Sequence, residues 1–254
     1  MLVVAAAVTA IAFFTVPLVG ILERADLGTL WNDLTTDQSL DALRLSLVCS
    51  LSAAALSMLF GTPLAWVLAR THVPFRPLLR GLVLLPMVLP PVVGGVALLA
   101  AFSLRSPVGG WLHDALGIQL TFSTGGVIMA ETFVAMPFFV ITVEGALRGM
   151  DQRLEDAAAS LGAGRFTVFR RVTLPLIAPS VAAGAVLAWA RALGEFGATI
   201  TFAGNIAGRT QTLPLAVYLQ LETDRDAAIA LSLVLLGVSF VVLVSLRERW
   251  LTRT

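Results

Sequence analysis

Three ionisable residues lie where charge is unusual, because each falls inside a long apolar run: Glu131, Arg191 and Glu195. A charge surrounded by hydrocarbon is costly, so such residues usually face a partner or a water-lined cavity. Arg191 and Glu195 are four residues apart and share one face of a helix, which favours an ion pair between them at least as much as contact with a transported substrate. Glu131 on a neighbouring helix is a second candidate partner for Arg191.

The residue types needed for catalysis or metal binding are sparse. The two histidines, His72 and His113, fall in predicted loops on opposite sides, and no H-E-x-x-H or C-x-x-C pattern occurs. A chain without lysine cannot form a G-x-x-x-x-G-K-[ST] phosphate loop, so any ATP, with its Mg²⁺, must be hydrolysed by a separate subunit. We expect no enzyme activity, catalytic residue, metal site or cofactor in this chain, and we expect Cys49 to be a packed thiol.

The composition indicates an integral membrane protein, with 57% hydrophobic residues, 13% charged residues and a mean hydropathy of +0.90. Apolar runs of about 20 residues or more are long enough to cross roughly 30 Å of hydrocarbon as helices. Six such runs are present: 3–22, 43–69, 79–104, 125–147, 176–203 and 227–246. No basic residue precedes the first run, which we therefore count as a span and not as a signal peptide. The prediction is an all-α, polytopic bundle of six transmembrane helices.

The distribution of arginine predicts the orientation of these spans. With the amino terminus inside, eleven arginines fall in cytoplasmic segments and five in external ones. Short loops rich in basic residues stay in the cytoplasm, so we expect both termini to be cytoplasmic. No basic run resembles a nucleic-acid-binding arm, and we expect the lipid bilayer, not nucleic acid, as the surroundings of this chain.

A polar segment at residues 150–175 interrupts the apolar pattern on the predicted cytoplasmic side. Leu154, Ala158 and Leu161 fall on one face of a short helix, and Gly162 is suited to end it in a left-handed conformation. A second short helix is expected from Arg165 before Pro175 restarts the chain at the next span. The alanines of the first helix would let another surface approach closely, which predicts a docking helix. The alternative is a solvated loop with alanines chosen for helix propensity.

Proline and glycine predict a broken third span. Pro86, Pro90 and Pro91 are followed by Gly94 and Gly95. Proline leaves backbone carbonyls without their helical hydrogen bond, and at membrane depth these carbonyls need a partner from the protein or from a water-lined cavity. The break therefore favours a position beside a transport pathway over a simple packing kink.

Hydroxyl groups on the fifth span suit transient contact with an anion better than a permanently exposed arginine, which would trap it. We therefore expect Thr199 and Thr201 near a gate, where Gly194 and Gly197 let helices approach closely.

The polar segment also carries a family resemblance. Asp156-Ala157-Ala158, followed at fixed spacing by Gly162 and by Val172-Thr173-Leu174-Pro175, resembles the EAA loop of bacterial ATP-binding-cassette (ABC) importer permeases. Aspartate stands for the usual glutamate, and valine for isoleucine. The resemblance implies that this is the coupling helix of the permease. Its implied contacts with the ATPase are Glu155, Asp156, Ala157, Ala158, Leu161, Gly162 and Gly164.

Two further segments narrow the resemblance to one group of permeases. Residues 191–199, RALGEFGAT, with their continuation to Tyr218, look like the fifth span and external loop of molybdate permease subunits. Residues 84–95, LLPMVLPPVVGG, are similar to the third span of the same group, and sulfate and thiosulfate permeases share much of this pattern. The resemblance covers most of the chain from about Leu40 onward.

The resemblance implies a type I ABC importer permease fold, a single domain over residues 1–254 with a core at 40–246. It also implies a homodimer in a bacterial cytoplasmic membrane, two ATPase subunits and an extracytoplasmic molybdate-binding protein. Transport would proceed by alternating access, with pathway or gate candidates Pro90, Pro91, Arg191, Glu195, Thr199 and Thr201. Asn205 and Arg209, in an external loop, are candidates for contact with the binding protein or for a merely solvated loop.

Other functions stay open at this point. Tungstate and sulfate, like molybdate, are tetrahedral dianions, and a sulfate, thiosulfate or tungstate permease is an alternative within the family. A secondary transporter or channel driven by an ion gradient, and an intramembrane enzyme, are alternatives of other classes. The docking segment argues against a transporter or channel driven by an ion gradient. The isolation of the acids from any histidine argues against an intramembrane enzyme.

Overall fold

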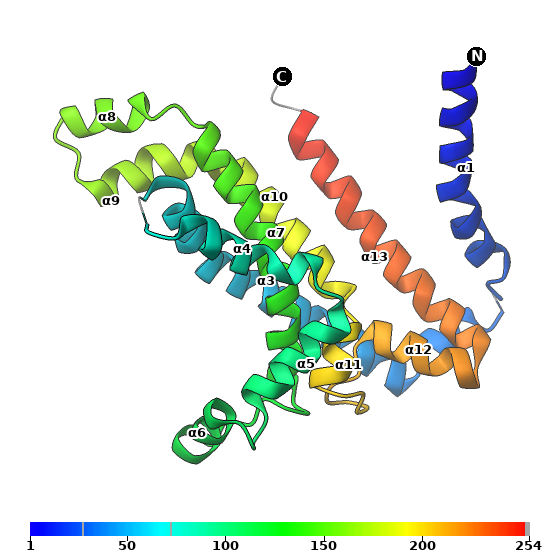
Figure 1. Cartoon of the computed structure of the whole chain (residues 1–254). Coiled ribbons are helices and arrows are strands. Elements are labelled where there is room, and N and C mark those ends of the chain that lie inside the picture. The colour runs from blue at the N-terminus through cyan, green and yellow to red at the C-terminus, as the bar shows by residue number, and fades with distance from the viewer. Residues whose placement is uncertain (27, 72, 252–254) are drawn as a thin grey trace. The chain divides into compact units, whose positions relative to one another are not determined.

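The computed structural model describes residues 1–26, 28–71 and 73–251, with side chains described as far as Val241. In this part of the chain every regular element is a helix, which confirms the all-α prediction (Figure 1). The elements are α1 Leu2–Glu23, α2 Leu30–Leu34, α3 Asp37–Arg70, α4 Arg76–Val88, α5 Pro91–Phe102, α6 Pro107–Leu116, α7 Thr124–Gly149, α8 Arg153–Ser160, α9 Arg165–Val168, η1 Phe169–Thr173, α10 Leu174–Leu193, α11 Gly197–Phe202, α12 Leu213–Thr223 and α13 Arg225–Leu251.

The predicted apolar runs fall on these helices. Among the described residues, four helical stretches are long and apolar enough to cross a membrane: α1, α3, α7 and the continuous stretch from Arg165 to Leu193. The pair α4 and α5 adds a fifth if it forms one span, although it bends by 118° at its break. The sixth run lies within α13, whose side chains beyond Val241 are outside the described part. The count of six spans therefore stays a prediction.

The chain divides into two compact units. One consists of residues 1–45 and 211–254, and its apolar core joins Ala42 of α3 to Leu213 and Ala216 of α12 and Leu231 of α13. The other consists of residues 46–210 and contains all the predicted coupling and pathway residues. The division of the chain into one permease domain with a core at 40–246 stays a prediction.

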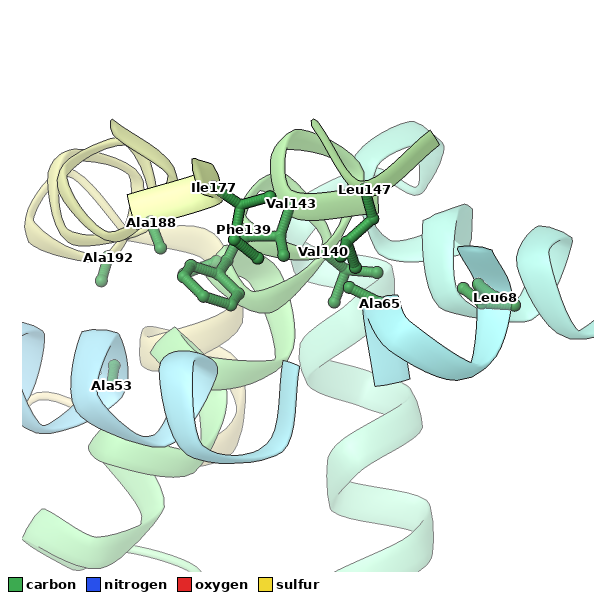
Figure 2. Packing of buried hydrophobic residues seen from close by; sticks show 11 residues of the cluster. Ala53, Ala65, Leu68, Phe139, Val140, Val143, Leu147, Ile177, Ala188 and Ala192 are labelled. Atoms are coloured by element: carbon green, nitrogen blue, oxygen red, sulfur yellow. The ribbon is translucent and has the colours of Figure 1, made fainter. Parts of the chain in front are cut away.

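Close helix packing in the unit of residues 46–210 centres on Phe139 of α7, which is fully buried. Figure 2 shows it with Val140, Val143 and Leu147 of the same helix, near α3 and α10. A methyl group added at Gly61 of α3 would lie 2.7 Å from the Phe139 ring, and one at Gly184 of α10 would lie 3.2 Å from its other edge. Two glycines thus admit the ring between neighbouring helices, as small residues do at helix interfaces in membranes.

The polar segment lies at one end of this unit, where α8 extends beyond the end of α7 and the chain turns back through α9 (Figure 1). Gly162 has φ +85° and ends α8 as predicted. The Ala163 N–H donates to the Ala158 carbonyl at 3.1 Å, and the Gly162 N–H to the Ala159 carbonyl at 2.9 Å. This pair of bonds is the Schellman arrangement, which requires a left-handed residue at the position of Gly162.

The connection into α10 differs from the expectation. Instead of a restart at Pro175, the chain runs on from Arg165 through a π-helical turn at Phe169–Thr173 into α10 without a break. Pro175 lies in the first turn of α10, where a missing backbone N–H is tolerated, and the wider π turn takes up the irregularity before it.

Candidate functional site

The predicted coupling segment, residues 150–175, exposes most of the surface that was predicted to dock. Asp156, Ala157, Gly162 and Gly164 are exposed, and Ala158 is half-buried. Leu161 at the end of α8 is 90% exposed. No residue of α8 or α9 is buried, so this helix pair carries little of the core of its own unit and leaves its small-residue face available to another surface.

Exposed apolar side chains lie on both sides of the turn in this segment. Leu154 on α8 lies before the turn, and Phe166 on α9 lies after it; Phe166 is 74% exposed. Single exposed apolar residues are ordinary, but a short polar segment with several of them is typical of an interaction surface.

Glu155 differs from its neighbours because its carboxylate points back into the protein. One oxygen lies 3.4 Å from Nη2 of Arg70, the last residue of α3. The other accepts a hydrogen bond of 2.6 Å from Oγ1 of Thr173, which is fully buried at the end of η1. The structure thus assigns Glu155 contacts within its own chain, and its predicted contact with an ATPase remains a prediction.

Sequence reasoning missed a third buried acid beside Glu131 and Glu195, namely Glu144 on α7, whose side chain is 1% exposed. Its carboxylate lies 2.5 Å from Nη2 of Arg148 and 3.4 Å from Nε of Arg80 on α4. The guanidinium groups of Arg76 and Arg148 both donate to the carbonyl of Leu68 near the end of α3. These contacts tie together the ends of α3, α4 and α7. The spacing of Glu144 and Arg148, four residues apart, was the available signal.

At the opposite end of α7 lies α6, which sequence analysis did not predict (Figure 1). Ser106 caps it by accepting a hydrogen bond of 3.0 Å from the Gly109 N–H. Trp111 on this helix is 61% exposed. A serine followed by proline at the first helical position was the signal for this element.

The proline-rich third run is broken as predicted, with α4 ending at Val88 and α5 beginning at Pro91. The fifth run is also broken, between Leu193 and Gly197. The two breaks meet, because a methyl group added at Gly197 would lie 2.9 Å from Cβ of Pro91. One added at Gly95 would lie 2.7 Å from Cβ of Thr201 and 2.8 Å from the Ala198 carbonyl. The predicted pathway prolines and threonines therefore belong to one crossing of α5 and α11.

Glu195 lies in the break between α10 and α11 and is 1% exposed. Its Oε2 lies 2.6 Å from Nη1 of Arg191, which confirms the predicted geometry of an ion pair along one helical face. Its Oε1 accepts a hydrogen bond of 2.8 Å from the Ala198 N–H in the first turn of α11. The carboxylate therefore bridges the end of one helix and the start of the next.

The two threonines of α11 differ in their surroundings. Thr199 is fully buried, and its hydroxyl has no hydrogen-bond partner among the described residues. Thr201 is half-buried, and its hydroxyl donates to the Gly197 carbonyl at 2.8 Å. Glu131, 1% exposed on α7, has no ion pair with Arg191 in the described part of the chain, and the partner of Arg191 there is Glu195.

A cavity of about 610 Å³ lies beside this crossing, between α3, α5 and α7, but its walls are apolar. Thr132 is the one lining residue with a polar side chain, and its hydroxyl donates to the Ile128 carbonyl at 2.6 Å. This wall presents hydrocarbon to its occupant and is unsuited to hold a dianion.

The loop with Asn205 and Arg209, which was predicted to be external, is held against the start of α7. The hydroxyl of Thr124 donates to the Arg209 carbonyl at 2.9 Å, while the Arg209 side chain is exposed. Asn205 is half-buried. Because α6 leads into α7, this loop and α6 both lie at the end of the unit away from the coupling segment.

Comparison with known proteins gives matches over most of the chain. The family model described as "Binding-protein-dependent transport system inner membrane component" matches residues 61–253. "Molybdenum transport system permease protein ModB" of Mycobacterium tuberculosis is 49% identical over 243 residues, 96% of this chain and 92% of the relative. "Sulfate transport system permease protein CysT" of Escherichia coli is 37% identical over 217 residues, 85% of this chain and 78% of the relative.

The fold has a counterpart among solved structures. A chain of a bacterial alginate ABC transporter, in complex with an alginate pentasaccharide-bound periplasmic protein, superposes with a TM-score of 0.77. The match covers 100% of this chain and 96% of the other, at 21% sequence identity, so it speaks for the fold alone.

Proposed function

Because the chain belongs to the family of binding-protein-dependent transport system inner membrane components, we propose that it is the permease subunit of an ATP-driven importer of molybdate. The observation that carries the choice of anion is the similarity to a named molybdenum permease over nearly the whole chain. The named sulfate permease is less similar and covers less of the chain, and sulfate or thiosulfate transport is therefore the second candidate. Tungstate has the same shape and charge as molybdate and stays within the proposal.

We propose six spans with both termini in the cytoplasm, and one permease domain over residues 1–254 with its core at 40–246. Two copies of the chain would enclose the pathway, two ATPase subunits would bind on the cytoplasmic side, and a molybdate-binding protein would bind outside. The excess of arginine in the segments assigned to the cytoplasm supports the orientation. The cytoplasmic membrane of a bacterium is the proposed location.

The exposed face of α8 supports its role as the coupling helix. Asp156, Ala157, Ala158 and Leu161 would contact the ATPase, and Gly162 with Gly164 would set the turn that follows. The ATPase subunits supply ATP and Mg²⁺ chemistry. When the two ATPase subunits bind ATP and close together, they would move α8 and switch the spans from an inward-facing to an outward-facing arrangement. ATP hydrolysis would then return the spans to the inward-facing state.

The crossing of α5 and α11 is the proposed place of the gate, with Pro90 and Pro91 on one side and Thr199 and Thr201 on the other. Two helix breaks meeting in one place give a backbone that can change direction without unfolding a whole span. Arg191 and Glu195 would position this crossing through their ion pair. The buried Thr199 hydroxyl, which lacks a described partner, is the group best suited to transient contact with an oxyanion.

On the external side, Asn205 and Arg209 remain the candidates for contact with the binding protein. We add α6 to this surface, because its exposed Trp111 precedes the start of α7 to which the Arg209 loop is bonded. Aromatic residues and arginine are enriched where protein interfaces are strongest.

The function is tested with the purified complex in proteoliposomes that contain ATP and an external molybdate-binding protein. Uptake of molybdate should require ATP, the ATPase subunits and the binding protein, and should continue when ion gradients are collapsed. Parallel assays with sulfate and tungstate separate the candidates within the family. Uptake by the permease alone, driven by an ion gradient, would sink the proposal in favour of a secondary transporter.

Ala158→Trp tests the docking surface. The indole would keep the small-residue face of α8 from close approach, and we expect at least a roughly tenfold loss of copurified ATPase and of uptake, as for a disrupted interface centre. Ala115→Trp, at an exposed position on α6, is the matched control for assembly and should leave the ATPase bound; its uptake is not compared, because α6 belongs to the surface proposed to contact the binding protein. Normal assembly and transport by Ala158→Trp would contradict the assignment of α8.

A further inference from the structure

The carboxylate of Glu155 joins three segments of the chain. It belongs to α8, pairs at 3.4 Å with the last residue of α3, Arg70, and accepts a hydrogen bond of 2.6 Å from Thr173 at the end of η1. The side chains of Arg70 and Glu155 are only 8% and 17% exposed, and Thr173 is fully buried. Contacts shielded in this way are less screened by solvent and salt than surface ion pairs.

The attachment of α8 to the rest of the unit is otherwise slight. The helix has eight residues, none of them buried, and short turns connect it to α7 and α9. A helix without buried residues cannot pass on a displacement through core packing, because it has no core packing to push against. Among its described polar side-chain contacts, those of Glu155 are the ones that reach α3 and η1.

The segments that carry the two partners of Glu155, α3 and η1, also contact each other directly. Trp66 of α3 and Phe169 of η1 make an edge-to-face contact with ring centroids 5.4 Å apart. This contact holds the end of α3 beside η1 independently of Glu155. Since η1 runs without a break into α10, a pull on the carboxylate reaches the ends of two predicted spans at once. A π-helical turn at this place is a conformation often found at functional sites.

We propose that Arg70, Glu155 and Thr173 form a transmission latch that converts movement of α8 into movement of α3 and α10. The latch rests on the proposed function, because the force on α8 is supplied by the ATPase. The division of work within the segment follows from exposure: the outward residues Asp156, Ala157 and Leu161 engage the ATPase, and the inward Glu155 passes the movement on. Arg70, Glu155 and Thr173 are positioning residues that touch no substrate.

The test measures coupling separately from assembly. In proteoliposomes, the complexes with Glu155→Gln and with Thr173→Val should retain the bound ATPase and its basal ATP hydrolysis. The number of molybdate ions imported per ATP should fall roughly tenfold, a size typical of broken coupling contacts. Thr173→Ser keeps the hydroxyl and should restore the wild-type ratio. The charge exchange of Arg70→Glu with Glu155→Arg should recover much of what Glu155→Arg alone loses.

Two results would overturn the latch. One is a wild-type ratio of ions per ATP in both Glu155→Gln and Thr173→Val. The other is a loss of uptake that is matched by loss of bound ATPase, which would make Glu155 a docking residue. Failure of the wild-type complex to import molybdate would overturn the proposed function itself, and the two failures are told apart by that wild-type measurement.

Discussion

Replacing Glu195 by alanine is expected to destabilise the permease severely and to abolish transport. The substitution leaves the charge of Arg191, which is 28% exposed, without its partner at 2.6 Å, and it also removes the acceptor of the Ala198 N–H. Removing one member of a buried ion pair typically costs about 3–5 kcal/mol of folding free energy. For a chain of this size we expect the midpoint of thermal unfolding in detergent to fall by roughly 10 °C.

Two further variants separate the charge of Glu195 from its hydrogen bond. Glu195→Gln keeps an oxygen that can accept from the Ala198 N–H and should be less damaging than alanine. The double variant Arg191→Met with Glu195→Met removes both charges and should recover much of the lost stability, because no charge is left unpaired. If the double variant is stable but inactive, the pair has a role in the pathway. If Glu195→Ala unfolds at the wild-type temperature, the bridging role of the carboxylate is wrong.

Gly95→Val should prevent α5 and α11 from packing together. We expect little folded protein and no measurable transport from this variant. Even the first added carbon would lie 2.7 Å from Cβ of Thr201 and 2.8 Å from the carbonyl of Ala198, and a backbone atom cannot rotate away as a flexible side chain can. Overpacking of this kind costs about 1–3 kcal/mol or more. The measurement is the yield of monodisperse protein in detergent together with molybdate uptake.

The control for this substitution is Gly81→Ala on α4. An added carbon at Gly81 meets no atom within 4 Å, and alanine stabilises an exposed helix interior by about 0.5–1 kcal/mol relative to glycine. We expect wild-type yield and uptake from this variant. A Gly95→Val protein that folds and transports like Gly81→Ala would show that the crossing of α5 and α11 is not close-packed in the working transporter.

The helices were predictable where local rules decide them. Long apolar runs placed α1, α3 and α7, Gly162 predicted the end of α8, and Pro90 with Pro91 predicted the break before α5. The spacing of Arg191 and Glu195 was enough to predict their ion pair. The apolar runs are continuous in the sequence, and the helix end, the helix break and the ion pair each depend on residues within about one or two helical turns of one another, so the sequence shows all of them directly.

Other features have a local signal that shows only part of the arrangement. The four-residue spacing of Glu144 and Arg148 indicates their ion pair, but not the second partner, Arg80, which comes from another helix. Ser106 and Pro107 mark the start of α6, but this helix is too short to stand out as an apolar run. The continuous passage from α9 through η1 into α10 was also unexpected, since a proline normally suggests a boundary.

For this chain, composition and residue spacing alone determined an all-helical membrane protein with a polar segment at residues 150–175 and no lysine for a phosphate loop of its own. Only the tertiary structure decided the direction in which each side chain of that segment points. Glu155 and Asp156 are adjacent acids in sequence, yet one is turned onto Arg70 and Thr173 and the other is exposed. Adjacent helical residues lie about 100° apart around the axis, and which of them faces inward depends on partners 85 residues before and 18 residues after Glu155.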